Sequence, residues 1–551
     1  MSTHALKTAV QFINKKESLV VDAIDGLLRA SGGANLARLD GYPGIKVVLR
    51  SDHNPNRKVA VICGGGSGHE PAHAGFVGKG MLTAAVCGEV FASPAIDAVF
   101  AAIMAVTGKA GCLVIFKNYT GDRLNFGLAV ERARALGKKV EVVIVKDDIA
   151  LPDIPQPRGI AGVMFVEKVA GHYAEKGADL KTVTAMAQKA ADGLVSLGIS
   201  LSSCTLPGIG REDRVPQGKA ELGLGLHGEP GVDLMNFEGA RQAALVVADR
   251  LFAAAKPARG YALLVNNLGS TTALEMSLLT NEVLASKHGA KVKLVLGPAM
   301  LVSSLDMHGF SLSLLPLTPD FEKALLSPAA PLVWPAVRSH VKPKLIKLPK
   351  EMKTKLPKAS KNPALSALVT KACGIIIKSE ATLNALDAKV GDGDTGSTMA
   401  TAARHVQTAL PLMPLAKLDQ FFNATSEALT RTMGGSSGVL LAIFFSAASQ
   451  AAAGGASWQK SLVAGLDKMM AYGGAKPGDR TMIDALQPAL AALAKGVDVA
   501  AAAARVGADA TAKMKSARAG RSSYVSASNL SGVTDPGAEA VALLLEGLAK
   551  G

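Results

Sequence analysis

Three carboxylates and a run of small residues occur together in the segment DAKVGDGDTGST, which begins at Asp387. Asp387, Asp392 and Asp394 fall within eight residues, and oxygen ligands at this density suit Mg²⁺ or Ca²⁺. The segment lacks the D-x-D-x-D-G run and the distal glutamate of an EF-hand loop. A predicted helix then opens at Gly396, Ser397 and Thr398. Because a helix N-terminus favours anions, the segment predicts a metal ion together with an anion such as phosphate.

A second candidate site lies in the loop CGGGSGHEPAH, residues 63–73, which follows a predicted strand. Its glycines allow the backbone to approach a ligand closely. His69 is the candidate acid or base of this loop. His69, Glu70 and His73 could instead bind a metal ion, or Glu70 and His73 could be structural residues that orient the loop and the helix after it.

A lysine and an aspartate follow another predicted strand, in KNYTGD at residues 117–122. At the end of a buried strand, Lys117 and Asp122 could hold and deprotonate a small hydroxylated substrate. The alternative is an ordinary surface salt bridge between the two side chains.

A single histidine stands among glycines in GLGLHGEPG, residues 223–231. The glycines remove neighbouring bulk and could expose the imidazole of His227 to a small ligand. An unprotonated imidazole nitrogen is a nucleophile that can add to a carbonyl. A lone histidine is more often structural, so both interpretations stay open at this point.

The elements that must position these residues differ between the two parts of the chain. Residues 1–335 alternate short apolar strands with small-residue loops and helices, which predicts parallel α/β sheets. In such sheets ligands bind at the carboxyl ends of the strands, where the loops above lie. A change of pattern near residue 196 divides this part into two predicted α/β subdomains, about 1–195 and 196–335.

Residues 364–551 are rich in Ala, Leu and Met with helical periodicity, which predicts an all-helical domain. Glycine-rich or polar breaks at 432–438, 476–482 and 534–538 fall at predicted helix ends and could together surround a nucleotide. The apolar stretch 438–454 is short and contains Ser and Gln, so we interpret it as a buried helix rather than a membrane span.

The 551-residue chain has a formal net charge of +15, and part of the excess lies in the lysine- and proline-rich segment 342–361. We interpret residues 336–363 as a solvated linker rather than a nucleic-acid-binding arm. Aromatic residues make up 4% of the chain, which counts against a surface for stacking bases. The five cysteines form no C-x-x-C pair and the N-terminus has no apolar signal region. We therefore expect a cytoplasmic protein that binds neither nucleic acid nor membranes.

The motifs in their order along the chain resemble the single-chain, ATP-dependent dihydroxyacetone kinases, also called glycerone kinases. The substrate-binding half of that family carries motifs similar to GGGSGHEP, KNYTGD and GLGLHGEPG. The nucleotide-binding half carries motifs similar to VGDGDTG, GGSSG, PGDRTM and DPGA. The resemblance extends over nearly the whole chain, and several long motifs in the same order are more specific than any one of them.

For the N-terminal half, the resemblance implies a role for each matching residue. His227 matches the histidine that forms a covalent hemiaminal with the ketone carbon of dihydroxyacetone, which glycerol cannot form. His69 and Asp122 match the acid/base residues. The substrate-binding positions correspond to Gly66, Ser67, Gly68, His69, Lys117 and Asp122. Whether D-glyceraldehyde is also a substrate stays open.

For the C-terminal half, the resemblance implies an eight-helix barrel that binds ATP. Asp387, Asp392 and Asp394 match the ligands of two Mg²⁺ ions. The expected ATP-binding positions are Gly396, Ser397, Thr398, Ser436, Ser437, Gly473, Met482, Arg521, Asp535, Pro536 and Gly537. Residues 525–538, VSASNLSGVTDPGA, depart from the longer acidic or histidine-bearing stretch that precedes DPG in the family. This departure could change the affinity for ATP or the catalytic rate.

The resemblance further implies a homodimer in which the nucleotide domain of one subunit covers the substrate site of the other. Two alternative functions exist among similar proteins. One is cleavage of FAD to cyclic riboflavin phosphate and AMP, and the other is a non-enzymatic regulatory role with bound ADP. The fusion of both halves in one chain favours an exchangeable ATP and hence the kinase.

Overall fold

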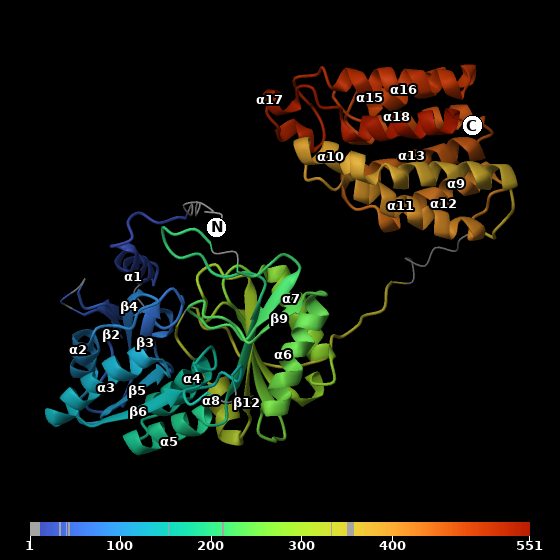
Figure 1. The fold of residues 1–551 in the computed structure, drawn as a ribbon. Coiled ribbons are helices and arrows are strands. Elements are labelled where there is room, and N and C mark those ends of the chain that lie inside the picture. Colours follow the sequence, from blue (N-terminus) through green and yellow to red (C-terminus); the bar gives the residue numbers. More distant parts are fainter. Residues whose placement is uncertain are drawn as a thin grey trace. The chain divides into compact units, whose positions relative to one another are not determined.

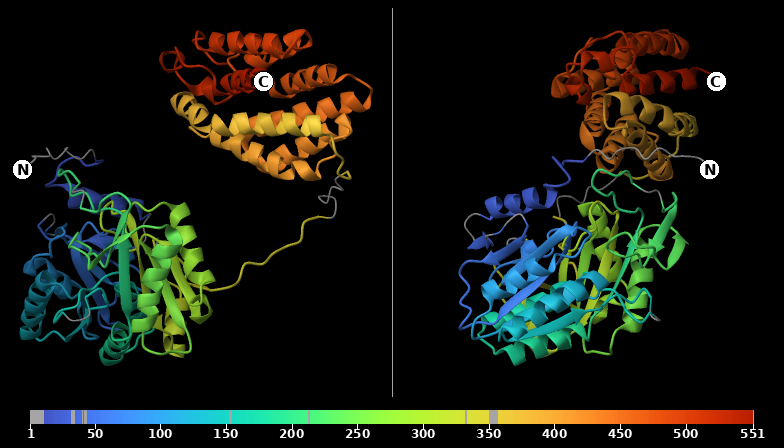
Figure 2. Two further views of the ribbon diagram at one scale, coloured as in Figure 1. Left: turned by 45° about the vertical axis from the view of Figure 1, so that its right-hand side comes forward. Right: turned by 60° about the vertical axis from the view of Figure 1, so that its left-hand side comes forward.

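The computed structural model describes residues 11–31, 35–39, 41, 44–151, 154–211, 214–331, 333–349 and 357–550. The chain divides into two compact units at Lys344 and Leu345. The first unit contains two sheets with their helices, and the second contains helices only within its described residues (Figure 1, Figure 2).

The first sheet has six strands in the order β1-β2-β4-β3-β5-β6. Strands β4, β3, β5 and β6 run parallel, and β1 and β2 extend the sheet in antiparallel fashion. The strands are β1 (Leu36–Arg38), β2 (Val47–Arg50), β3 (Ala60–Ser67), β4 (Ala84–Val90), β5 (Cys112–Lys117) and β6 (Val140–Val145). Helices α2 (Ile96–Val106) and α3 (Thr120–Ala135) pack on one face. Helices α1 (Leu19–Ala30), α4 (Val163–Glu175) and α5 (Leu180–Ala191) pack on the other.

The second sheet has seven strands in the order β13-β11-β10-β12-β7-β8-β9. They are β7 (Val195–Ser200), β8 (Lys219–Leu222), β9 (Asp233–Asn236), β10 (Tyr261–Asn267), β11 (Val292–Ala299), β12 (Gly309–Pro316) and β13 (Arg338–Ser339). Helices α6 (Ala240–Ala254) and α7 (Ala273–Ala285) cover one face. The expectation of parallel sheets is wrong here, because only β10 and β11 run parallel. Among their described residues the connections β7–β8 and β8–β9 contain no crossover helix, and these strands pair in antiparallel fashion.

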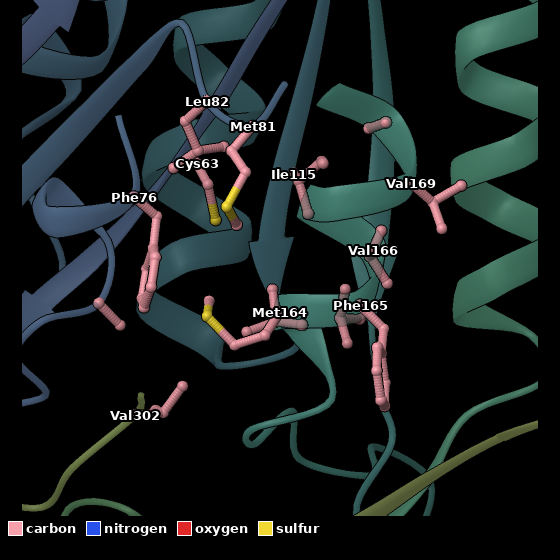
Figure 3. Packing of buried hydrophobic residues seen from close by; sticks show 14 of the residues in the cluster. Cys63, Phe76, Met81, Leu82, Ile115, Met164, Phe165, Val166, Val169 and Val302 are labelled. Carbon is pink, nitrogen blue, oxygen red and sulfur yellow. The ribbon is translucent and has the colours of Figure 1, made fainter. Parts of the chain in front are cut away.

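One hydrophobic core joins the two sheets and includes α4, α5 and α8 (Pro319–Leu326). The side chains of Cys63, Ile115 and Met164 belong to it (Figure 3). Backbone bonds also connect the two subdomains, since Ser303 N donates to His69 O at 3.1 Å and Leu305 N donates to Gly68 O at 2.8 Å. The loop after β3 is therefore fixed against a loop of the second sheet.

The second unit is helical, as the periodicity of residues 364–551 predicts. Its helices are α9 (Pro363–Lys378), α10 (Glu380–Val390), α11 (Thr395–Ala409), α12 (Leu418–Thr432), α13 (Gly435–Ala453), α14 (Trp458–Gly473), α15 (Ile483–Ala492), α16 (Val497–Thr511), α17 (Ala527–Leu530) and α18 (Pro536–Ala549). Contacts run from α9 to α11, α12, α13, α14, α15, α16 and α18 in turn, and α18 contacts α9 again.

Small side chains allow some of these helices to approach closely. Alanines of α15, α16 and α18 form one buried cluster. A side chain at Gly507 would collide with the carbonyl oxygen of Asp484, so α15 and α16 meet backbone to backbone at this position. Within the part of the chain that the structure describes, no helix is long and apolar enough to cross a membrane.

Candidate active site

Four rings from separate segments of the first unit meet at one place. His69 follows β3, Phe91 follows β4, Tyr119 lies between β5 and α3, and His227 lies in the loop between β8 and β9. The ring centroid of His227 is 5.0 Å from that of His69, 5.2 Å from Phe91 and 4.6 Å from Tyr119. The structure thus brings together two histidines that are far apart in the sequence.

His69 is buried, with 1% of its surface exposed. Its Nδ1 lies 2.8 Å from the carbonyl oxygen of Ser303, so Nδ1 carries the hydrogen and donates it. Nε2 is buried and has no hydrogen-bond partner within the described residues. Burial, and next the charge of Lys117, lower the pKa of His69 well below its usual value. The imidazole is therefore neutral at physiological pH and offers a free Nε2 lone pair to a ligand.

His227 is held by Glu229, which the sequence analysis did not single out. Glu229 Oε1 lies 3.0 Å from His227 Nδ1, and Oε2 accepts from the backbone N–H of His227 at 3.0 Å. Burial would raise the pKa of Glu229, but the hydrogen bonds from His227, the charge that its ring carries when protonated and the backbone N–H of Glu229 outweigh it and lower the pKa to about 2. Because a carboxylate only accepts, Nδ1 of His227 carries the hydrogen. The Nε2 lone pair is then the nucleophilic one, and the ring is 23% exposed on its side-chain surface.

Lys117 and Asp122 are both buried, so a surface salt bridge does not describe them. Asp122 lies in the first turn of α3, and Ser93 Oγ donates to its Oδ1 at 2.6 Å. A carbon atom built at the Cβ position of Gly65 would lie 3.5 Å from Lys117 Nζ and 3.8 Å from Asp122 Oδ2. A small substrate at this point would touch both a cation and a carboxylate.

The glycine-rich loop is closely packed. A Cβ at Gly66 would lie 2.8 Å from Ala92 N, and a Cβ at Gly68, where φ is +96°, would lie 2.8 Å from the ring of Phe91. Ser67 Oγ donates to the carbonyl oxygen of Gly88 at 2.7 Å. The backbone of residues 66–68 therefore lies directly against residues 88–92, and larger side chains would move it.

The alternative of a metal ion at His69, Glu70 and His73 is not supported by the geometry. Glu70 accepts from the backbone N–H of Gly68 at 2.9 Å. His73 bonds to Glu167 and Lys117 instead, and His69 bonds to Ser303. The three side chains thus have separate partners and do not form a group of possible ligands within the described residues.

The second unit contains the predicted aspartate cluster. One ligand atom each of Asp387, Asp392 and Asp394 lies within 4.8 Å of the others. Asp387 Oδ2 accepts from the backbone N–H groups of Asp394 and Thr395 at 3.0 and 3.1 Å, which holds the loop around the carboxylates. Three converging carboxylates fit Mg²⁺, a hard cation that prefers oxygen ligands.

The start of α11 is packed against α10. Ser397 Oγ donates to Glu380 Oε1 at 3.1 Å and accepts from Asn384 Nδ2 at 2.8 Å. A side chain at Gly396 would collide with the carbonyl oxygen of Glu380. Thr398 N donates to the carbonyl oxygen of Asp394 at 2.9 Å, so the helix begins immediately after the aspartate loop.

Two of the predicted ATP-binding stretches lie side by side. A Cβ at Gly537 would lie 3.1 Å from Met482 Cβ, and Arg480 Nη2 donates to the carbonyl oxygen of Val533 at 2.7 Å. Asp535 caps α18, because its Oδ1 accepts from Ala538 N at 2.9 Å, and Pro536 occupies the first turn.

The remaining predicted ATP positions are spread over other helix ends. Ser437 lies in the first turn of α13, and Gly473 is the last residue of α14, beside Leu440. The side chains of Ser436 and Arg521 lie outside the described part of the chain.

Comparison with known proteins supports one family over the whole chain. The Dak1 domain model matches residues 33–332, and the DAK2 domain model matches residues 389–550. The chain is 48% identical to the dihydroxyacetone kinase of Citrobacter freundii, over 98% of this chain and 99% of that protein. The chain belongs to the dihydroxyacetone kinase family. A human relative, named triokinase/FMN cyclase, is 38% identical over 98% of this chain and 99% of that protein.

Solved structures of this family match the fold as well. The native crystal structure of the Citrobacter freundii dihydroxyacetone kinase matches with a TM-score of 0.69 at 47% identity, over 99% of this chain and 100% of that one. The structure of the same kinase with AMP-PNP and Mg²⁺ gives a TM-score of 0.68. A dihydroxyacetone kinase operon co-activator, DhaQ, matches at 30% identity with a TM-score of 0.53 and covers 57% of this chain.

Proposed function

We propose that this chain transfers the γ-phosphoryl group of ATP to a terminal hydroxyl of dihydroxyacetone. The observation that carries the proposal is the group formed by the partly exposed His227 with the buried His69, Lys117 and Asp122. The same chain also contains an aspartate cluster at a helix start. A nucleophilic imidazole suits a ketone, and the lysine and aspartate suit a hydroxyl group. Relatives named dihydroxyacetone kinase cover the chain from end to end.

His227 captures the substrate. Its Nε2 forms a bond to the ketone carbon as the π bond of the carbonyl breaks. The resulting alkoxide oxygen takes a proton from solvent water at this partly exposed position. Glu229 accepts the Nδ1 hydrogen bond and stabilises the positive charge that develops on the ring. Holding the substrate in one orientation in this way can contribute about 7–11 kcal/mol to lowering the barrier.

Asp122 and Lys117 act on the hydroxyl that is phosphorylated. Asp122 Oδ2 removes the hydroxyl proton, while Ser93 holds the other carboxylate oxygen. The Lys117 ammonium donates to a substrate oxygen, and the neutral His69 accepts a hydrogen bond at Nε2. The hydroxyl oxygen then forms a bond to the γ-phosphorus, and the bond from phosphorus to ADP breaks.

Asp387, Asp392 and Asp394 would hold Mg²⁺, which supplies positive charge to the phosphates when bound. Gly396 to Thr398 open α11 beside them, where the positive end of the helix dipole favours an anion. The N–H groups of Ser397 and Thr398 already donate to Asn384 Oδ1 and Asp394 O, so the helix dipole rather than these two donors would attract the phosphates. The absence of a phosphate-loop lysine is consistent with this arrangement. The other positions named above for ATP belong to the same proposal.

We also propose the finer architecture that the resemblance implies. The closed order of contacts from α9 to α18 supports an eight-helix barrel, with α9 and α10 counted as one helix interrupted at Ser379. The extent of the two family models supports a substrate-binding domain 1–335, a linker 336–363 and a nucleotide-binding domain 364–551. The start of β7 at Val195 supports the division of the first domain near residue 196.

A homodimer in which each copy serves the other's substrate site is part of the proposal, and the long linker supports it. A cytoplasmic location is supported by the five cysteines, all of them free.

Cleavage of FAD is a second candidate activity, because several relatives are named triokinase/FMN cyclase. Incubation with FAD and Mn²⁺ tests it. A purely regulatory role is disfavoured, since the co-activator DhaQ covers only 57% of this chain.

The test of the proposed function is an enzyme-coupled assay of ADP release with dihydroxyacetone, D-glyceraldehyde and glycerol as acceptors. We expect release that depends on dihydroxyacetone and stays at background with glycerol, which has no carbonyl. Equal rates with glycerol would contradict capture at His227, and no dihydroxyacetone-dependent release would contradict the kinase itself.

A further inference from the structure

Two buried polar groups, His73 and Glu167, continue from Lys117 as a hydrogen-bonded chain, and neither has a role in the proposed reaction. Lys117 Nζ lies 2.9 Å from His73 Nε2, and His73 Nδ1 lies 2.5 Å from Glu167 Oε1. The exposed fractions are 1% for Lys117, 4% for His73 and 0% for Glu167. The lysine comes from the end of β5, the histidine from the loop after β3, and the glutamate from the middle of α4.

The chemistry of the three groups assigns every hydrogen in this chain. An ammonium group can only donate, so His73 Nε2 accepts from Lys117. Nδ1 of His73 must then carry the hydrogen, and it donates to the Glu167 carboxylate. Burial, and next the charge of Lys117, lower the pKa of His73, so the imidazole stays neutral. The chain therefore contains one positive, one neutral and one negative group, and its net charge is zero.

We propose that His73 and Glu167 are positioning residues for the phosphorylation reaction, which keep Lys117 charged and orient its ammonium group toward the substrate. The inference rests on the proposed function. A buried charge is costly unless it is paired and hydrogen-bonded. Glu167 supplies the compensating charge across the imidazole, and only one of the three ammonium hydrogens is used by His73. The remaining donors can reach the point beside Gly65 that lies next to both Lys117 Nζ and Asp122 Oδ2.

A metal site is the obvious competing interpretation, because ligand atoms of Cys63, His73 and Glu167 lie within 4.8 Å of one another. Both imidazole nitrogens of His73 are already engaged, one by the ammonium and one through its own hydrogen. Burial, and next the negative charge of Glu167, raise the pKa of Cys63 well above its usual value, so the sulfur is a thiol rather than a thiolate ligand. A cation here would also be repelled by Lys117.

The other titratable groups that face this chain are His69, Asp122 and Cys63. Of these, His69 and Asp122 belong to the proposed catalytic machinery, and Cys63 is buried as a neutral thiol. Substitution of Glu167 therefore removes the carboxylate that balances the charge of Lys117 on the side away from the substrate. The groups proposed to contact the substrate remain in place. Loss of an adjacent opposite charge shifts a pKa by about 1–3 units, and because the imidazole of His73 separates Glu167 from Lys117, we expect a shift at the lower end of that range.

The test compares the full-length wild type with Glu167→Gln, which keeps the shape and removes the charge. Lysines labelled with ¹³C at Cε are titrated by NMR without substrate, and Lys117→Met assigns the signal. We expect Lys117 to lose its proton at a pH about 1 unit lower in Glu167→Gln than in the wild type. In the pH profile of kcat/KM for dihydroxyacetone, the alkaline limb should move in the same direction.

The matched control is Lys168→Met, which removes another buried charge from the next position of α4. Lys168 Nζ donates to Ala324 O and Ser327 Oγ, away from the site, so both titrations should be unchanged. If Glu167→Gln lowers the melting temperature but leaves the titration of Lys117 where it was, the positioning role is wrong. If Glu167→Gln does not fold, Glu167→Asp, which keeps the charge, and His73→Gln, which breaks the connection between Lys117 and Glu167, are measured in the same way. The titration of Lys117 should stay near the wild-type value in Glu167→Asp and move in His73→Gln, and an unchanged titration in His73→Gln would overturn the proposal. If the wild type has no kinase activity but the titration of Lys117 shifts in Glu167→Gln, only the proposed function would be overturned.

Discussion

Asp535 caps α18 in a buried position, and its ionisation should lower the stability of the nucleotide-free protein. Burial raises the pKa of Asp535 from the usual 3.8 to about 6, although the hydrogen bond from Ala538 and the charge of Arg480 oppose the shift. The folded pKa lies above the unfolded value. The contribution to stability is therefore complete below about pH 4 and is lost as the pH rises through about 6.

The size of the effect follows from that difference of about two units. At about 1.4 kcal/mol for each unit, ionisation of Asp535 reduces the free energy of unfolding by about 3 kcal/mol at neutral pH. Asparagine caps a helix about as well as aspartate and carries no charge. Asp535→Asn should therefore stabilise the helical unit at pH 7.5 by up to about 3 kcal/mol. For a domain of this size each kcal/mol corresponds to about 2–4 °C in the melting temperature.

The assay is differential scanning calorimetry of the full chain without nucleotide, at pH 4.0 and pH 7.5. The transition of the helical unit is identified by its shift on addition of Mg-ADP. Asp179→Asn is the control, because Asp179 also caps a helix, accepting from Thr182 N at 2.8 Å. Its pKa is lowered by the hydrogen bonds from Thr182, so its replacement should bring no gain at pH 7.5. A gain for Asp535→Asn that is equal at both pH values, or absent at pH 7.5, would refute the reasoning.

Three further substitutions test the site. Asp122→Asn keeps an oxygen that can accept from the Ser93 hydroxyl but removes the catalytic base, so kcat should fall about 10²–10⁴-fold in the coupled assay. A kcat within a factor of three of the wild-type value would show that Asp122 is not the base. Glu229→Gln replaces the charged acceptor of the His227 hydrogen bond with a neutral one, and a hydrogen bond to a charged group contributes about 1.5–3 kcal/mol. The value of kcat/KM for dihydroxyacetone should therefore fall about 10–100-fold, while the KM for ATP, the control, should stay unchanged. Asp387→Asn should abolish the Mg²⁺-dependent part of ADP binding in calorimetry while leaving Mg²⁺-free binding intact, and normal Mg-ADP affinity would contradict the metal site.

Strands β3 and β5 of the first sheet and the loops after them could be predicted from local patterns, whereas the antiparallel strands β1 and β2 were not expected. Apolar runs that end in CGGG and KNYTGD give β3 and β5, and the topology rule for parallel sheets places the loops after them at one edge. His69 and Asp122 were found for that reason. The second sheet could not be predicted as well, because strand direction depends on how distant segments pair. The short strands β8 and β9 give no periodic signal of their own.

The sequence did not predict which side chains and carbonyl groups form hydrogen bonds to the site residues. Glu229 stands two residues after His227, and a carboxylate so close to a candidate nucleophile was a usable signal. Ser93 and Ser303 come from unrelated loops, so only the fold could bring them to Asp122 and His69. The contact between His73 and Glu167 likewise joins residues that are 94 positions apart.

The central claim is that His227 captures a ketose for phosphorylation, and one NMR experiment tests it most directly. Dihydroxyacetone labelled with ¹³C at the ketone carbon is added to an excess of the full chain, and Mg-ATP is added afterwards. We predict that the carbonyl resonance is replaced by that of a tetrahedral carbon, that this signal is absent with His227→Ala, and that Mg-ATP converts it to the phosphorylated product. A ketone signal that stays unchanged in the wild type, with phosphorylation proceeding at the same rate in His227→Ala, would contradict the account.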